Sequence, residues 1–124
     1  MKIPDGYQAV MPYLILKNAK GFIDFTQKVF NAEIVSKHLR EDGETIQHAE
    51  IQISGSVIMC AESTEEYPPQ TSNLFIYVED ADQAYEAALQ NGATSAQEPS
   101  DREYGRACGV RDATGNTWWI TSVK

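Results

Sequence analysis

The sequence lacks the features that would place it among secreted disulfide scaffolds or membrane proteins. Only two cysteines, Cys60 and Cys108, occur among 124 residues, and both lie in apolar stretches with the composition of strands. Residues 1–10 show no apolar signal-peptide core, and no apolar run approaches the length of a membrane span. We therefore expect reduced core cysteines and a cytoplasmic protein with no membrane partner.

Basic residues are also scarce. The chain has 10 Lys and Arg against 18 Asp and Glu, which gives a formal net charge of −8. Nucleic-acid binding needs clusters of Lys and Arg, so this balance predicts no nucleic acid partner. It would suit a cationic ligand, but many proteins are this acidic for solubility alone, and we favour that interpretation. The chain has no glycine-rich phosphate loop, nucleophile elbow or zinc-finger spacing, so no residue is assigned as catalytic.

What the sequence does contain is an internal repeat with a period of about sixty residues. Asn18 and Asp80 each open a helical pattern, and Gly55 and Gly115 each precede an apolar strand. A fixed period of this kind indicates a duplicated supersecondary unit. We expect one domain over residues 1–124, with one repeat at about 7–62, a linker at about 63–71 and a second repeat at about 72–124.

Each repeat has the pattern β-α-β-β-β. The first is expected to form its strands and helix at 8–16, 18–31, 33–40, 46–53 and 56–61. The second is expected to form them at 73–78, 80–92, 94–98, 107–111 and 117–122, with a polar loop at 99–106. Strands clustered after each helix predict an α+β fold with mixed or antiparallel sheets.

Four stretches carry a resemblance to a known family. They are PYLILKNAKGFIDFTQKVFNAE, HAEI, VEDADQAYEAALQNGA and YGRACGVRDATGNTWWI. In this order they resemble the vicinal oxygen chelate superfamily, and within it the PhnB-like, glyoxalase/bleomycin-resistance branch. Ala113 departs from the family pattern, which has proline there. The resemblance implies two curved half-sheets with their helices on the convex side, and a homodimer with sites in the concavities.

The resemblance also marks four positions where metal-using relatives carry His or Glu. They fall on Met11, Met59, Asn73 and Trp119. A thioether is a soft ligand, an amide is a weak one, and an indole does not ligate. We therefore expect no metal and no other cofactor at the inherited site.

Alternation along the strands sorts the remaining residues by face. One face is uniformly apolar and suits helix packing: Leu14, Leu16, Ile58, Cys60, Leu74, Ile76, Val78 and Ile120. The other face should line the concavity, with Tyr13, Phe75 and Tyr77 beside the four marked positions and with His48, Glu50 and Gln52 on the strand 46–53. The predicted pocket is aromatic and rich in methionine, as small-molecule pockets often are.

Several side chains have more than one interpretation. His48 and Glu50 can recruit a metal, do acid–base work or make a structural hydrogen bond. Arg106 can clamp an anionic ligand at the cavity mouth beside Tyr104, or pair with Asp101 or Glu103. Met11, Met59 and Trp119 can line a pocket or fill the concavity as core.

The sequence thus predicts a glyoxalase/bleomycin-resistance-like protein that binds and sequesters an unknown small molecule without a metal. One alternative is a metal-dependent lyase, isomerase or dioxygenase with a nonstandard site around His48 and Glu50. Another is an interaction protein whose concavity is filled. The expected ligand-binding residues are Met11, Tyr13, His48, Glu50, Met59, Asn73, Phe75, Tyr104, Arg106 and Trp119.

Overall fold

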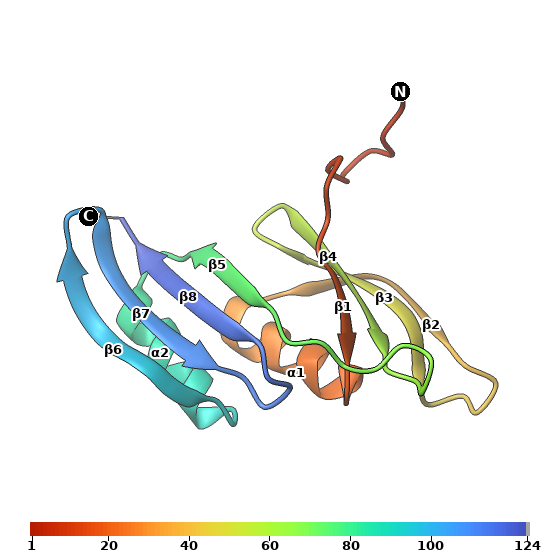
Figure 1. Ribbon diagram of the computed structural model, residues 1–124. Helices are drawn as coiled ribbons and strands as arrows, with labels where there is room; N and C mark the ends of the chain where they lie inside the picture. Colours follow the sequence, from red (N-terminus) through yellow and green to blue (C-terminus); the bar gives the residue numbers. More distant parts are fainter. Residues whose placement is uncertain (124) are drawn as a thin grey trace.

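The computed structural model describes residues 1–123, which form two β-α-β-β-β units (Figure 1). The first unit consists of β1 (Tyr13–Leu16), α1 (Ala19–Phe30), β2 (Glu33–Leu39), β3 (Ile46–Ile53) and β4 (Ser56–Glu62). The second consists of β5 (Asn73–Tyr77), α2 (Ala81–Gln90), β6 (Thr94–Arg102), β7 (Gly105–Arg111) and β8 (Thr117–Ser122). The repeat predicted from the sequence is confirmed.

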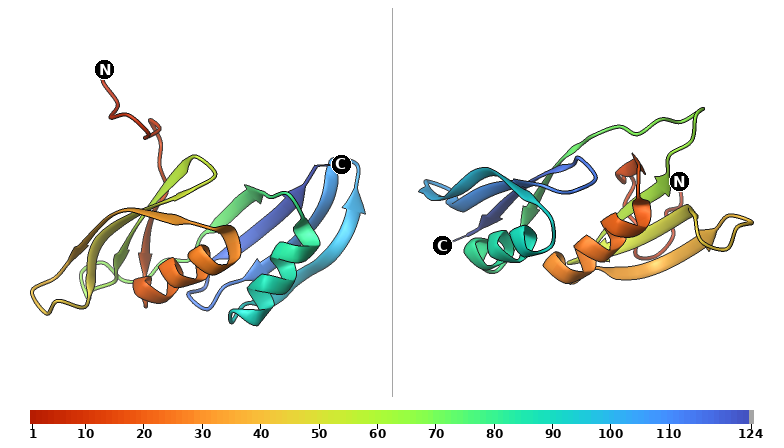
Figure 2. Two further views of the ribbon diagram at one scale, coloured as in Figure 1. Left: turned by 180° about the vertical axis from the view of Figure 1, so that it is seen from behind. Right: turned by 90° about the horizontal axis from the view of Figure 1, so that it is seen from below.

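Both units have the same sheet topology. The strand orders are β1-β4-β3-β2 and β5-β8-β7-β6. In each sheet the first strand runs parallel to the last, and the other neighbours are antiparallel. The sheets are therefore mixed, as predicted. Both helices lie on the same side of the molecule and contact each other (Figure 2).

The helix ends follow the predicted capping residues. The Asn18 side chain accepts a hydrogen bond from the Gly21 backbone N–H at 3.0 Å, and Asn31 ends α1 in the left-handed conformation. The Asp80 side chain accepts from the Gln83 backbone N–H at 3.1 Å at the start of α2. These caps set the points at which the chain enters and leaves each sheet.

The core lies between the helices and the convex faces of the sheets. The apolar strand face predicted from alternation is buried there or packs against it. Trp118 of β8 stacks on Phe22 of α1 with ring centroids 6.2 Å apart, and it meets Phe30 at 4.8 Å. Because Phe22 and Phe30 belong to the first unit and Trp118 to the second, this aromatic cluster joins the two halves.

The two cysteines belong to this buried face. Cys60 and Cys108 are free and buried, as predicted. Burial raises the pKa of the Cys60 thiol to about 12 and that of Cys108 to about 11. Both groups are therefore protonated and unreactive at neutral pH.

Two segments were predicted wrongly. The strand expected at 8–16 begins only at Tyr13. The loop expected at 99–106 is mostly strand: β6 runs on to Arg102 and β7 begins at Gly105. Pro99 suggested a loop because it has no N–H. However, β6 is an edge strand, and its pairing is irregular between Gln97 and Ser100, where proline is tolerated.

The last turn is organised by Asp112. Its Oδ1 accepts hydrogen bonds from the backbone N–H groups of Thr114 and Asn116, and its Oδ2 accepts one from the Trp118 indole at 2.8 Å. This carboxylate therefore links the β7–β8 turn to the aromatic cluster. Within residues 1–123, neither helix is long and apolar enough to cross a membrane.

Candidate functional site

The faces opposite the helices hold most of the predicted ligand-binding residues. Strand register lines up Tyr13, Met59 and Glu50 across the first sheet. It lines up Phe75, Trp119 and Gly109 at the matching places of the second. We call the concave side of the first sheet, with Tyr7, Tyr13, His48, Glu50 and Met59, the polar face. We call that of the second, with Asn73, Phe75, Tyr77 and Trp119, the aromatic face.

A chain of hydrogen bonds runs across the polar face. The Tyr7 hydroxyl donates to Glu50 Oε1, and His48 Nε2 lies 2.9 Å from Glu50 Oε2. On the other side of the ring, His48 Nδ1 lies 3.3 Å from the Tyr13 hydroxyl. The tyrosine and histidine rings are 5.6 Å apart. Four side chains from three parts of the chain thus form one connected network.

Tyr7 was not among the residues selected from the sequence. It lies in the segment before β1, which was expected to be a strand from residue 8 onward. The Gln8 side chain holds this segment against β4, because its amide pairs with the backbone N–H and C=O of Val57 at 3.3 and 2.8 Å. Pairing between a glutamine side chain and a strand backbone leaves no periodic pattern in the sequence. The sequence therefore did not indicate that this segment brings Tyr7 to the site.

The network fixes the charge of Glu50, which is only 8% exposed. Its pKa is lowered, first by the hydrogen bond from Tyr7 and then by that from His48. The pKa of Tyr7 is raised by the same contact with Glu50. Glu50 is therefore an ionised carboxylate held by two donors, with Tyr7 in its neutral, donating form.

The aromatic face is open to solvent. Phe75 is 57% exposed and Tyr77 is 63% exposed, and their rings meet edge to face with centroids 5.2 Å apart. The Trp119 indole N–H donates to the Asn73 amide oxygen at 3.1 Å, which fixes the indole beside Phe75. The indole lies over Gly109, where an added Cβ would come within 2.7 Å of the ring. Glycine at this position therefore makes room for the tryptophan.

Two predicted residues lie away from both faces. The Arg106 guanidinium extends to the α2 side of its sheet, where it makes two 3.1 Å hydrogen bonds to Asp82 and lies 3.6 Å from Asp101. This ion pair raises the pKa of Arg106 and lowers that of Asp82. Tyr104 lies in the exposed turn between β6 and β7. Arg106 therefore pairs on the α2 side of its sheet and does not join the concave residues at a cavity mouth.

The four positions marked for metal ligands do not fit a divalent ion. Met11 and Met59 offer only thioethers, and the Asn73 amide oxygen already accepts from Trp119. Across residues 1–123, no group of three or more His, Cys, Asp or Glu side chains is arranged to hold a metal ion. No step of a metal-dependent reaction can be assigned to these side chains.

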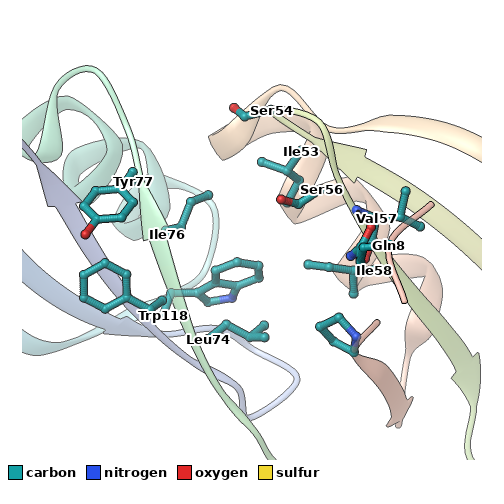
Figure 3. A pocket seen from close by; sticks show the side chains of 12 residues that line it. Gln8, Ile53, Ser54, Ser56, Val57, Ile58, Leu74, Ile76, Tyr77 and Trp118 are labelled. Atoms are coloured by element: carbon teal, nitrogen blue, oxygen red, sulfur yellow. Dashed lines mark hydrogen bonds between the residues drawn. The ribbon is translucent and has the colours of Figure 1, made fainter. Parts of the chain in front are cut away.

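A cleft of about 400 Å³ is lined by residues of both halves. It lies between β5 and the start of β4, with Ile58 and Leu74 on opposite walls and the Trp118 indole reaching into it (Figure 3). Phe75 and Tyr77 of the aromatic face also line it. The cleft therefore connects the open aromatic face to the space between the halves.

Comparison with known proteins agrees with this architecture. The uncharacterized protein Rv0887c of Mycobacterium tuberculosis is 28% identical over 122 residues, which cover 89% of this chain and 71% of that protein. The crystal structure of TnmS3, an antibiotic binding protein from Streptomyces sp. CB03234, matches with a TM-score of 0.72 at 13% identity, covering 95% of this chain and 100% of that one.

A PhnB protein from Bacillus cereus also has this fold, with a TM-score of 0.72 at 18% identity, covering 94% of this chain and 100% of that one. At these identities the two structures show likeness of fold alone. The sequence itself is more specific, because residues 9–120 match a family description over nearly the whole chain. The chain belongs to the Glyoxalase/Bleomycin resistance protein/Dioxygenase superfamily.

Proposed function

We propose that this protein binds and sequesters a small aromatic molecule without the help of a metal ion. The observation that carries the proposal is the set of exposed aromatic rings on the concave faces. Tyr13 is 51% exposed, and Phe75 and Tyr77 are more exposed still. Large aromatic side chains gathered in the open on a concave surface are typical of a binding site. TnmS3, which shares the fold, is described as an antibiotic binding protein.

We further propose that the binding protein is a homodimer in which the polar face of one protomer lies opposite the aromatic face of its partner. Each face is an open half-sheet in a single chain, so neither encloses a ligand alone. A pairing of this kind would shelter the exposed rings from water while leaving space between the sheets. Sedimentation velocity tests it directly: a monomer at micromolar concentration, with and without ligand, contradicts this arrangement.

Thermal unfolding against a panel of aromatic and cationic compounds tests the binding role. A compound present at 100 times its dissociation constant should stabilise the protein by about 2.7 kcal/mol. Phe75→Ala and Trp119→Ala should abolish the stabilisation. Tyr67→Ala is the matched control, because Tyr67 is an exposed aromatic residue of the segment between the units. A panel without any stabilising compound contradicts the proposal.

Elemental analysis separates this role from metal-dependent catalysis. Protein purified without chelators should carry no stoichiometric zinc, manganese, iron or nickel. The side chains at the four positions marked for metal ligands, Met11, Met59, Asn73 and Trp119, are poor ligands for these ions. Stoichiometric metal that is lost in His48→Ala would instead favour an enzyme with a nonstandard centre at His48 and Glu50.

A further inference from the structure

The hydrogen-bond chain of the polar face has a direction. Glu50 is an acceptor on both of its oxygens, so the His48 nitrogen 2.9 Å away, Nε2, carries the hydrogen of that bond. In neutral histidine the other nitrogen, Nδ1, is then an acceptor, and the Tyr13 hydroxyl 3.3 Å away donates to it. With His48 neutral, the hydrogen bonds therefore run from the Tyr13 hydroxyl to His48 Nδ1 and from His48 Nε2 to Glu50.

The groups that face this chain do not interrupt it. Strand β2 places His38 opposite His48 and Ser36 opposite Glu50. His38 is exposed, and the Ser36 hydroxyl contributes to lowering the Glu50 pKa. Strand β4 contributes the uncharged Met59 between Tyr13 and Glu50. Tyr7 holds the second oxygen of Glu50, so the carboxylate keeps its orientation toward His48.

The outer end of the chain faces the open concavity. Tyr13 is half exposed, and its hydroxyl oxygen keeps a lone pair that can accept a hydrogen bond from a ligand. Beside it lie the Met59 thioether and the His48 ring, which offer apolar and aromatic contact to a ring. A proton acceptor next to such surfaces matches an aromatic molecule that carries an acidic hydroxyl group.

We propose that Tyr13, His48 and Glu50 form a proton relay that binds an acidic phenol as its phenolate, a role that rests on the proposed function of the concave faces. The phenol proton moves to the Tyr13 oxygen while the Tyr13 proton moves to His48 Nδ1. The products are a phenolate that accepts a hydrogen bond from Tyr13 and an imidazolium that is paired with Glu50. No proton is gained or lost overall. Tyr13 contacts the ligand, whereas Glu50 and Tyr7 are positioning residues.

The test compares two probes, 4-nitrophenol and 4-nitroanisole, which differ by the acidic hydrogen. The neutral and ionised forms of 4-nitrophenol absorb at different wavelengths, so the spectrum reports the position of the proton. At a pH at which the free probe is neutral, we expect the bound probe to show the phenolate spectrum. Tyr13→Phe and His48→Gln should abolish that spectrum and weaken 4-nitrophenol binding at least about tenfold, because a charge-assisted hydrogen bond is lost.

Three controls make the outcome decisive. In the same variants, 4-nitroanisole should bind within about twofold of the wild-type protein, which shows that the face is still folded. Tyr67→Phe, in the segment between the units, should leave both probes unchanged. Glu50→Gln should reduce the phenolate fraction, and Glu50→Asp should restore part of it, which a merely structural role would not do.

The opposite results overturn the relay. Equal binding of both probes with a neutral spectrum refutes proton transfer while leaving aromatic binding intact. Binding of neither probe refutes the assignment to phenols, and the thermal panel of the preceding section then judges the sequestering function separately.

Discussion

The two halves of this protein share one topology and differ in the faces that they expose. At matching places across the sheets, the first half has Tyr13, Met59 and Glu50, and the second has Phe75, Trp119 and Gly109. One row ends in a buried carboxylate that organises hydrogen bonds, and the other ends in a glycine that makes room for an indole. The buried side of each unit maintains the fold, while the concave side is free to take on different chemistry.

The two helices also differ in the side chains that they bury. The buried face of α1 carries Phe22, Phe25 and Phe30, whereas that of α2 carries three alanines and one large side chain, Tyr85. Two of the large side chains of α1, Phe22 and Phe30, contact Trp118 of the second unit. The first half therefore supplies two of the three rings in the cluster that joins the halves.

The largest effect should come from removing one of these rings. Phe22→Ala should destabilise the protein by about 4 kcal/mol, because it opens a cavity beside Trp118 in the cluster that joins the units. Urea unfolding measures the loss. The control is Ala84→Gly on α2, which should cost only about 1 kcal/mol of helix propensity. Equal losses in the two variants contradict the asymmetry between the helices.

The next largest loss of stability is expected from one of two aspartates that lie in turns. Asp112 is buried and Asp42 is exposed, although both accept backbone hydrogen bonds in turns between strands. Asp112→Ala should cost roughly 3 kcal/mol, because it leaves the Trp118 indole N–H buried without an acceptor. Asp42→Ala should cost roughly 1 kcal/mol or less, because water replaces the lost acceptor. Urea unfolding of both variants checks the order, and a reversed order contradicts it.

A smaller effect is expected from a change in the packing of the Trp119 indole. Gly109→Ala should cost about 1 kcal/mol and shift the tryptophan fluorescence, since the new methyl group forces the indole away from Asn73. Binding of an aromatic ligand should weaken, while the fold is retained. Trp119→Phe in the Gly109→Ala background should recover the stability. A spectrum unchanged from the wild type shows that the indole does not lie over Gly109.

The smallest effect concerns acid stability in the first half. The pKa of Glu50 is lower in the folded protein than its usual value of 4.5, so its ionised form stabilises the fold at neutral pH. That contribution is complete above the usual value and is lost as the pH falls through the lowered folded pKa. Glu50→Gln should therefore show a shallower loss of stability below about pH 4.5. Urea midpoints measured from neutral to acid pH check this, and parallel curves contradict it.

The architecture could be predicted from the sequence because its signals are local and repeated. Asn18, Asn31 and Asp80 begin or end the helices as their capping chemistry requires. Alternation along the strands correctly placed Leu14, Ile58 and Ile120 in the core. These features depend on a few neighbouring residues, so the order of residues is sufficient to reveal them.

The site depends on contacts between distant residues, which have no such signal. Tyr7 meets Glu50 across 43 positions, and Trp119 meets Asn73 across 46. Arg106 turned toward Asp82 because the expected loop is a strand, which fixes the face to which its side chain belongs. Alternation identified the right strands, but it did not identify the partners of their side chains.

The irregular strand β6 has a consequence for how the molecule avoids aggregation. Outer edge strands invite pairing with other chains, which leads to uncontrolled polymerisation. Pro99 and the irregular pairing of β6 make one outer edge a poor template, and two register shifts do the same for β2 at the other. The inner edge strands β1 and β5 pair without such shifts. Of the four edge strands, β1 and β5 therefore have the regular backbones, and they lie toward the middle of the molecule (Figure 1).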